Sequence, residues 1–169
     1  MKEFKTDKVY LLSYLVLSCL YVLFLAVVAF KYGINLNFFV LVLLMLPILI
    51  RVYSLIKKKI QISDNGIEIE DIFKSGFVRW SDIDSVGISM RRKIFLILSL
   101  KDGGAFLIDD NVEGFEDILK EIEKHVPKDR LPENWEEAVS SYKPSRSGIF
   151  LVLLAILVIL YVVFKSFMG

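Results

Sequence analysis

The chain has 169 residues, of which 55% are hydrophobic, and its 21 Lys and Arg residues nearly balance its 20 Asp and Glu residues. This balance is not typical of nucleic-acid-binding proteins, and the single cysteine, Cys19, excludes an intramolecular disulfide framework and a cysteine-based zinc site. We therefore expect no nucleic-acid partner, no metal and no cofactor.

Three uncharged apolar runs of 22, 19 and 18 residues dominate the pattern of hydropathy. They are Val9–Phe30, Tyr32–Ile50 and Ser147–Phe164. A helix rises about 1.5 Å per residue and needs about 20 residues to cross a bilayer core. The sequence therefore predicts an N-terminal tail and a transmembrane hairpin within residues 1–59, with spans at about 9–30 and 34–56, and a third span over 148–166.

The first run has an alternative interpretation as a cleaved signal peptide, because Lys2, Lys5 and Lys8 resemble its positive leading region. The run is longer than the 7–15 apolar residues of such peptides, and no cleavage site of small residues follows it. We therefore favour a helical hairpin, with Gly33 in the turn.

Basic residues near the spans predict the orientation, because Lys and Arg are retained on the cytoplasmic side. Nine of them lie on one predicted side: Lys2, Lys5, Lys8, Arg51, Lys57, Lys58, Lys59, Lys143 and Arg146. Only Lys31 and Lys165 lie on the other. We expect a multi-pass protein of the plasma or inner membrane with a cytoplasmic N-terminus and soluble domain and an external C-terminus.

The segment between the second and third runs contains short apolar stretches separated by turn residues, which indicates an antiparallel meander. Six strands are predicted: Ile60–Ser63, Ile67–Phe73, Phe77–Trp80, Ile83–Met90, Ile94–Leu100 and Ala105–Asp109. Asp64-Asn65-Gly66 and Asp102-Gly103 are typical of hairpin turns, because Asn and Gly accept positive φ.

One amphipathic helix follows the strands, with Asn111 as the expected N-cap and Pro127 at its end. His125 lies in its last turn, where a capping or surface position is favoured over catalysis. Residues 127–147 are predicted to form a linker with a short amphipathic helix. Its Trp135 has two alternative positions, in the headgroup layer or, as we prefer, packed against the β domain.

Three motifs of the soluble segment resemble those of bacterial pleckstrin-homology-like (PH-like) domains in small membrane proteins. They are Asp64-Asn65-Gly66-Ile67, Trp80-Ser81-Asp82-Ile83 and Lys101-Asp102-Gly103-Gly104. The resemblance covers residues 60–126. It implies an α+β membrane protein in which three transmembrane helices accompany an antiparallel, partly closed barrel with one C-terminal helix, and a binding or assembly module without enzymatic activity.

Two basic clusters are the candidate lipid-binding residues. They are Lys57, Lys58, Lys59 and Arg91, Arg92, Lys93. Charges of this kind attract anionic headgroups, and arginine adds planar paired donors for phosphate. The alternative for the first cluster is a role in topology alone, and for the second a solvated hairpin tip.

The sequence contains no phosphate-binding glycine loop, nucleophile elbow or calcium-loop spacing. We expect a non-enzymatic membrane protein whose soluble domain binds lipid headgroups or a protein partner and assists assembly or regulation at the membrane. Its partners would be the bilayer and a second membrane protein or another copy of the chain. The alternative is an accessory or protective factor for export or immunity that acts through its spans.

Overall fold

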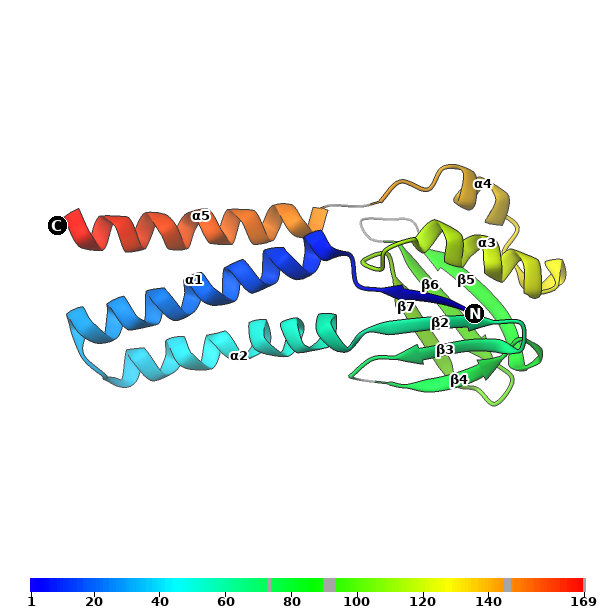
Figure 1. The fold of residues 1–169 in the computed structure, drawn as a ribbon, viewed down its shortest axis with the longest axis horizontal. Helices are drawn as coiled ribbons and strands as arrows, with labels where there is room; N and C mark the ends of the chain where they lie inside the picture. The colour runs from blue at the N-terminus through cyan, green and yellow to red at the C-terminus, as the bar shows by residue number, and fades with distance from the viewer. Residues whose placement is uncertain (73, 90–93, 145–146, 169) are drawn as a thin grey trace. The chain divides into compact units, whose positions relative to one another are not determined.

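The computed structural model describes residues 1–72, 74–89, 94–144 and 147–168, and its elements are labelled in Figure 1. The chain forms two compact units. One contains Met1–Asp7 together with Lys57–Ser147, and the other contains Lys8–Ile56 together with Gly148–Gly169. Each unit therefore consists of segments that are distant in the sequence.

The helical unit contains α1 (Lys8–Tyr32), α2 (Leu36–Lys57) and α5 (Ser147–Met168). Only 6% of the most hydrophobic window of α1, and 17% of those of α2 and α5, is buried within the protein. All three helices are long and apolar enough to cross a membrane, as the sequence predicts. Gly33, at φ 74°, ends α1 and donates its amide to the carbonyl of Ala29, as expected for the hairpin turn.

The other unit contains two antiparallel sheets, with strand orders β1-β2-β3-β4 and β5-β6-β7. The strands are β1 (Lys2–Lys5), β2 (Lys59–Ser63), β3 (Gly66–Glu70), β4 (Gly76–Arg79), β5 (Ile83–Ser89), β6 (Phe95–Leu100) and β7 (Ala105–Asp109). The predicted turns at Asp64-Asn65-Gly66 and Asp102-Gly103 join β2 to β3 and β6 to β7. Gly66 is required at its position, because a Cβ there would lie 2.2 Å from the carbonyl oxygen of Val78.

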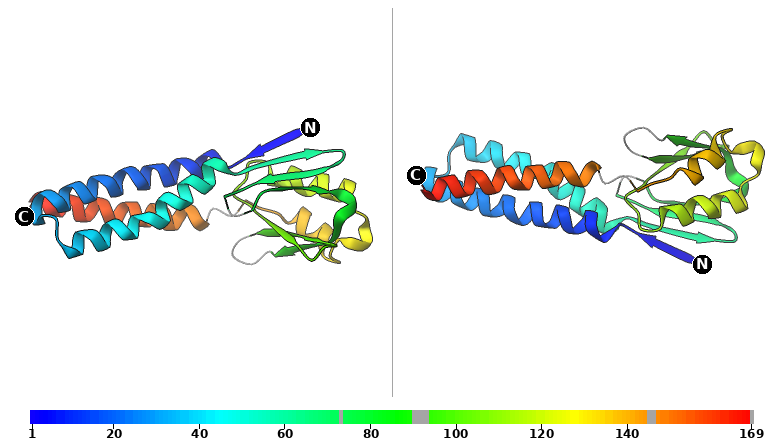
Figure 2. Two further views of the ribbon diagram at one scale, coloured as in Figure 1. Left: turned by 90° about the horizontal axis from the view of Figure 1, so that it is seen from below. Right: turned by 90° about the horizontal axis from the view of Figure 1, so that it is seen from above.

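The first strand, β1, is an addition to the six strands predicted from the sequence. Figure 2 shows this first strand, drawn in dark blue at the N-terminus. It pairs antiparallel with β2, so that Lys2 lies opposite Ile62 and Lys5 opposite Lys59. Phe4 is 8% exposed and joins the hydrophobic core. The residues predicted to be an N-terminal tail therefore belong to the sheet, and the apolar hairpin α1–α2 is inserted between the first and second strands.

Figure 1 shows helix α3 (Phe115–His125) beside the strands, and its apolar side chains belong to the same hydrophobic core as those of the sheets. Ile118, Leu119 and Ile122 are fully buried. The expected N-cap, Asn111, lies upstream of the helix, and Gly114 at φ 74° occupies the N-cap position instead. A positive φ suits glycine at this chain reversal.

Three short helical segments complete the described part of the unit, namely η1 (Trp80–Asp82), η2 (Lys128–Arg130) and α4 (Trp135–Ser140). The 3-10 helix η1 (Trp80–Asp82) makes the corner between β4 and β5, and Trp80 donates its Nε1–H to the carbonyl of Ser63 at 3.0 Å. Helix α4 (Trp135–Ser140) follows α3, and Trp135 is 3% exposed within the core. The preferred packing of Trp135 against the β domain is therefore confirmed.

Candidate functional site

The predicted lipid-binding residues occupy different environments. Arg91, Arg92 and Lys93 lie outside the described residues. Lys57 is exposed at the end of α2, whereas Lys59 on β2 is half-buried, with its Nζ 3.2 Å from Oε2 of Glu3. Lipid binding by these residues stays a prediction.

The side chain of Lys58, unlike that of Lys57, is buried. It is 5% exposed, and its ammonium contacts the carboxylate of Asp109, itself 8% exposed. The same ammonium donates to Oδ1 of Asn111 at 3.2 Å. Side chains alternate along a strand, so Lys58 lies on the same face as the buried Ile60 and Ile62. Extending that alternation back by one residue would have predicted its burial.

The N-terminal segment (Met1–Asp7) forms backbone contacts with residues 111–113, close to this ion pair in the sequence. Thr6 forms an antiparallel bridge with Val112, directly after β7. The amide of Asp7 donates to the carbonyl of Asn111, and the amide of Glu113 donates to the carbonyl of Lys5, both at 2.8 Å. The N-terminal segment thus pairs with β2 in one sheet and with residues 111–113, which follow the last strand of the other sheet.

Charges on β1 reinforce this pairing. The carboxylate of Glu3 accepts from Lys5 at 2.8 Å, from Gln61 at 3.1 Å and from Lys59 at 3.2 Å. The hydrogen bond from Lys5, followed by those from Gln61 and Lys59, lowers the pKa of Glu3 to about 2. Glu3 therefore stays ionised in the folded protein at any physiological pH.

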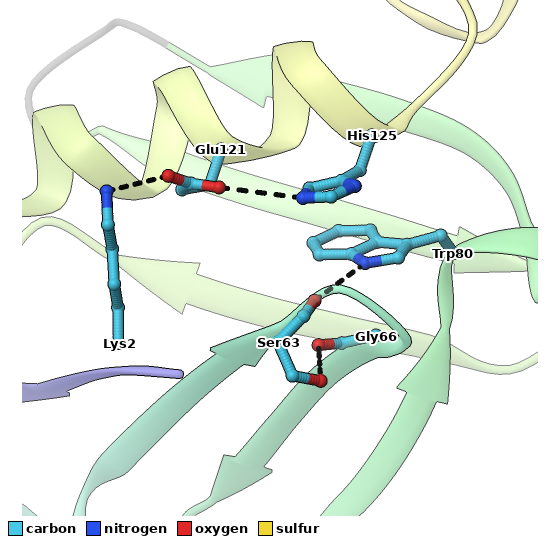
Figure 3. A network of polar contacts seen from close by, with 6 residues as sticks. All are labelled: Lys2, Ser63, Gly66, Trp80, Glu121 and His125. Atoms are coloured by element: carbon cyan, nitrogen blue, oxygen red, sulfur yellow. Dashed lines mark hydrogen bonds and ion pairs between the residues drawn. The ribbon is translucent and has the colours of Figure 1, made fainter.

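A second polar network joins β1, α3 and η1, and is drawn in Figure 3. Lys2 Nζ lies 2.7 Å from Oε1 of Glu121, and this hydrogen bond lowers the pKa of the Glu121 carboxyl. The other Glu121 oxygen lies 3.6 Å from Nε2 of His125, whose ring stacks on Trp80 at a centroid distance of 4.8 Å and an interplanar angle of 7°. His125 does lie in the last turn of α3, but its stacking partner is 45 residues away in sequence and could not be predicted.

A pocket of about 320 Å³ lies where the chain passes from α3 through the 3-10 helix η2 (Lys128–Arg130) to α4. We call it the α3–α4 pocket. It is lined by Glu123, Lys128, Asp129, Leu131, Pro132, Glu133, Trp135 and Glu136. Trp135 Nε1 is buried without a hydrogen-bond partner among the described residues. The pocket thus combines an apolar part with several carboxylates.

Within the described ranges, no three His, Cys, Asp or Glu side chains are grouped as a metal site would require. Comparisons of the chain with protein-family models, with curated proteins and with solved structures found no match. The chemistry of the residues described above is therefore the basis for inferring a function.

Proposed function

We propose that this chain is a non-enzymatic integral membrane protein whose two-sheet unit is a PH-like module that binds a protein partner at the membrane and assists assembly or regulation there. The seven antiparallel strands in the described part of the chain, followed by α3, support the PH-like assignment, because the barrel of that family has seven strands. The three long apolar helices support membrane insertion.

The observation that carries the proposal is the insertion of the α1–α2 hairpin between β1 and β2. The two-sheet unit is connected to apolar helices after Asp7, before Lys57 and after Ser147. If those helices span a bilayer, the unit cannot leave the membrane surface without losing its first strand. A module held in this way acts on molecules that are themselves at the membrane.

A protein partner is favoured over a lipid headgroup because two of the candidate lipid-binding lysines already pair with carboxylates within the unit. Lys58 is neutralised by Asp109 inside the unit, and Lys59 is paired with Glu3 on its surface. The carboxylates of the α3–α4 pocket would repel an anionic leaflet. Lipid binding remains the second candidate, based on the exposed Lys57 and on the Arg91-Arg92-Lys93 motif of the sequence.

Binding is favoured over catalysis because the titratable groups of the two polar networks described above contact one another. Lys58 and Asp109 form a buried ion pair, and His125 stacks on Trp80 beside Glu121. These contacts stabilise the fold by joining strands and α3. A catalytic group would instead have to reach a substrate.

Photo-crosslinking in cells tests the proposal. The photoreactive residue benzoylphenylalanine would replace Phe77 on β4 or Leu107 on β7, which are 53% and 54% exposed, or the exposed Glu137 on α4. We expect a protein adduct of defined mass from at least one position. Adducts with phospholipid alone would contradict the proposal. Protein adducts obtained only from a position on α5, such as the exposed Leu151, would favour a function exerted through the helices.

A further inference from the structure

The α3–α4 pocket has a strong excess of negative charge. Four of its lining residues are acidic, namely Glu123, Asp129, Glu133 and Glu136, and Lys128 is the one basic residue among the described residues that line it. Lys128 Nζ lies 3.8 Å from Oε1 of Glu136, so it offsets one carboxylate and leaves an excess of three. Such a site attracts a cationic ligand and repels anionic lipid.

The same pocket has an apolar part that a small cation would not use. Leu131, Pro132 and Trp135 line it together with the carboxylates. Trp135 is 3% exposed, and its Nε1–H is a buried donor without an acceptor among the described residues. A buried unpaired donor of this kind carries a free-energy cost. The volume of about 320 Å³ is at the lower end of that of pockets for small ligands and is suited to one large side chain.

We propose that the α3–α4 pocket docks a basic peptide segment that carries an apolar or aromatic anchor side chain. The anchor would contact Leu131, Pro132 and Trp135, and the flanking Lys or Arg residues would pair with the carboxylates of Asp129 and Glu133. Cytoplasmic segments next to membrane spans combine basic and apolar residues in this way. The occupant would therefore be the juxtamembrane segment of a partner membrane protein, an assignment that rests on the function proposed above.

Peptide binding to the full chain in nanodiscs of phosphatidylcholine tests this inference, because neutral lipid does not itself attract a basic peptide. The probe is the fluorescent peptide KRWLRK, followed by anisotropy. The Asp129→Asn/Glu133→Gln double variant removes two pocket charges and should weaken binding roughly tenfold. The matched control, Glu70→Gln/Glu137→Gln, removes two exposed charges that do not line the pocket and should leave binding unchanged.

A second probe, KRGGRK, keeps the charges and removes the anchor, and it should bind at least about tenfold more weakly than KRWLRK. Three results would each overturn the inference. The control variant could weaken binding as much as the pocket variant does, the two peptides could bind equally well, or KRWLRK could fail to bind to the unmodified chain. If KRWLRK fails to bind while crosslinking at Phe77 or Leu107 still captures a protein of defined mass, the pocket is not the docking site and the proposed function stands. If KRWLRK binds as expected while crosslinking yields phospholipid alone, the pocket assignment stands and the proposed function fails.

Discussion

The buried ion pair between Lys58 and Asp109 leads to the sharpest stability prediction. Replacing Asp109 with Asn removes, at almost constant volume, the carboxylate that contacts the Lys58 ammonium, which is 5% exposed. Removing one partner of a buried ion pair typically costs about 3–5 kcal/mol. The total stability of a domain is about 5–15 kcal/mol, so Asp109→Asn should remove a large part of it.

The double variant Lys58→Met/Asp109→Leu removes both charges and should be far less damaging, because neither ion is then left buried alone. One cost is the loss of the hydrogen bond from Lys58 to Oδ1 of Asn111, about 1 kcal/mol. The two substitutions should therefore be strongly non-additive, with a coupling free energy of more than about 2 kcal/mol.

Urea unfolding of the full chain in detergent, followed by tryptophan fluorescence, measures these free energies. Both tryptophans, Trp80 and Trp135, belong to the two-sheet unit, so the signal does not report on α1, α2 or α5. Glu116→Gln, which breaks the exposed ion pair with Lys120, is the control and should have little effect. A loss of less than about 1 kcal/mol for Asp109→Asn, or a double variant as unstable as Asp109→Asn, would refute the assignment of a buried charge pair.

Three further predictions concern the sheets. Phe4→Ala should cost about 3 kcal/mol in the same urea experiment, because Phe4 is 8% exposed in the core, and an unchanged midpoint would mean that β1 is not part of the unit. The pKa of Glu3 is about 2 in the folded protein and 4.5 in its ordinary state, so its contribution to the free energy of unfolding is complete above pH 4.5 and is lost as the pH falls through 2. When this free energy is measured against pH, Glu3→Gln should flatten that part of the curve. The effect should be small, because Glu3 is exposed to solvent. Gly66→Ala should lower the urea midpoint far more than Gly87→Ala. The added Cβ would lie 2.2 Å from a carbonyl oxygen at position 66, but 3.7 Å from a side-chain carbon at position 87. Equal midpoints of the two variants would contradict the tight hairpin.

Local patterns made much of this fold predictable. The three apolar helices follow from uninterrupted hydropathy, and the β6–β7 hairpin follows from Asp102-Gly103, where Gly103 has φ 84°. The β2–β3 hairpin also lies at its predicted turn, but neither Asn65 nor Gly66 has a positive φ there, and Gly66 is needed for the close approach of Val78 instead. The burial of one face of α3 follows from the helical spacing of its apolar residues. Each of these signals lies within a single segment of the chain.

Long-range pairing explains what the sequence did not show. Strand β1 has four residues and one apolar side chain, Phe4, so it has no detectable alternation, and its partner β2 begins more than 50 residues later. The burial of Lys58 was not foreseen, because this residue precedes β2 and was grouped by its charge with Lys57 and Lys59. The Trp80–His125 stack and the Lys2–Glu121 ion pair likewise join segments that no local pattern connects.

The most direct test of the central claim, a binding module built around an inserted membrane hairpin, is the sidedness of the chain in intact cells. Single cysteines at Lys2, Asn65 or Asn37, in a Cys19→Ser background, would be labelled with a membrane-impermeant maleimide. Because β1 pairs with β2, the cysteines at Lys2 and Asn65 must share one side. If α1 and α2 span the membrane, Asn37 near the hairpin turn would lie on the other side. We predict that Asn37→Cys is labelled from outside the intact cell, and that Lys2→Cys and Asn65→Cys are labelled only after permeabilisation. Labelling of Lys2→Cys and Asn65→Cys from different sides would contradict the pairing of β1 with β2.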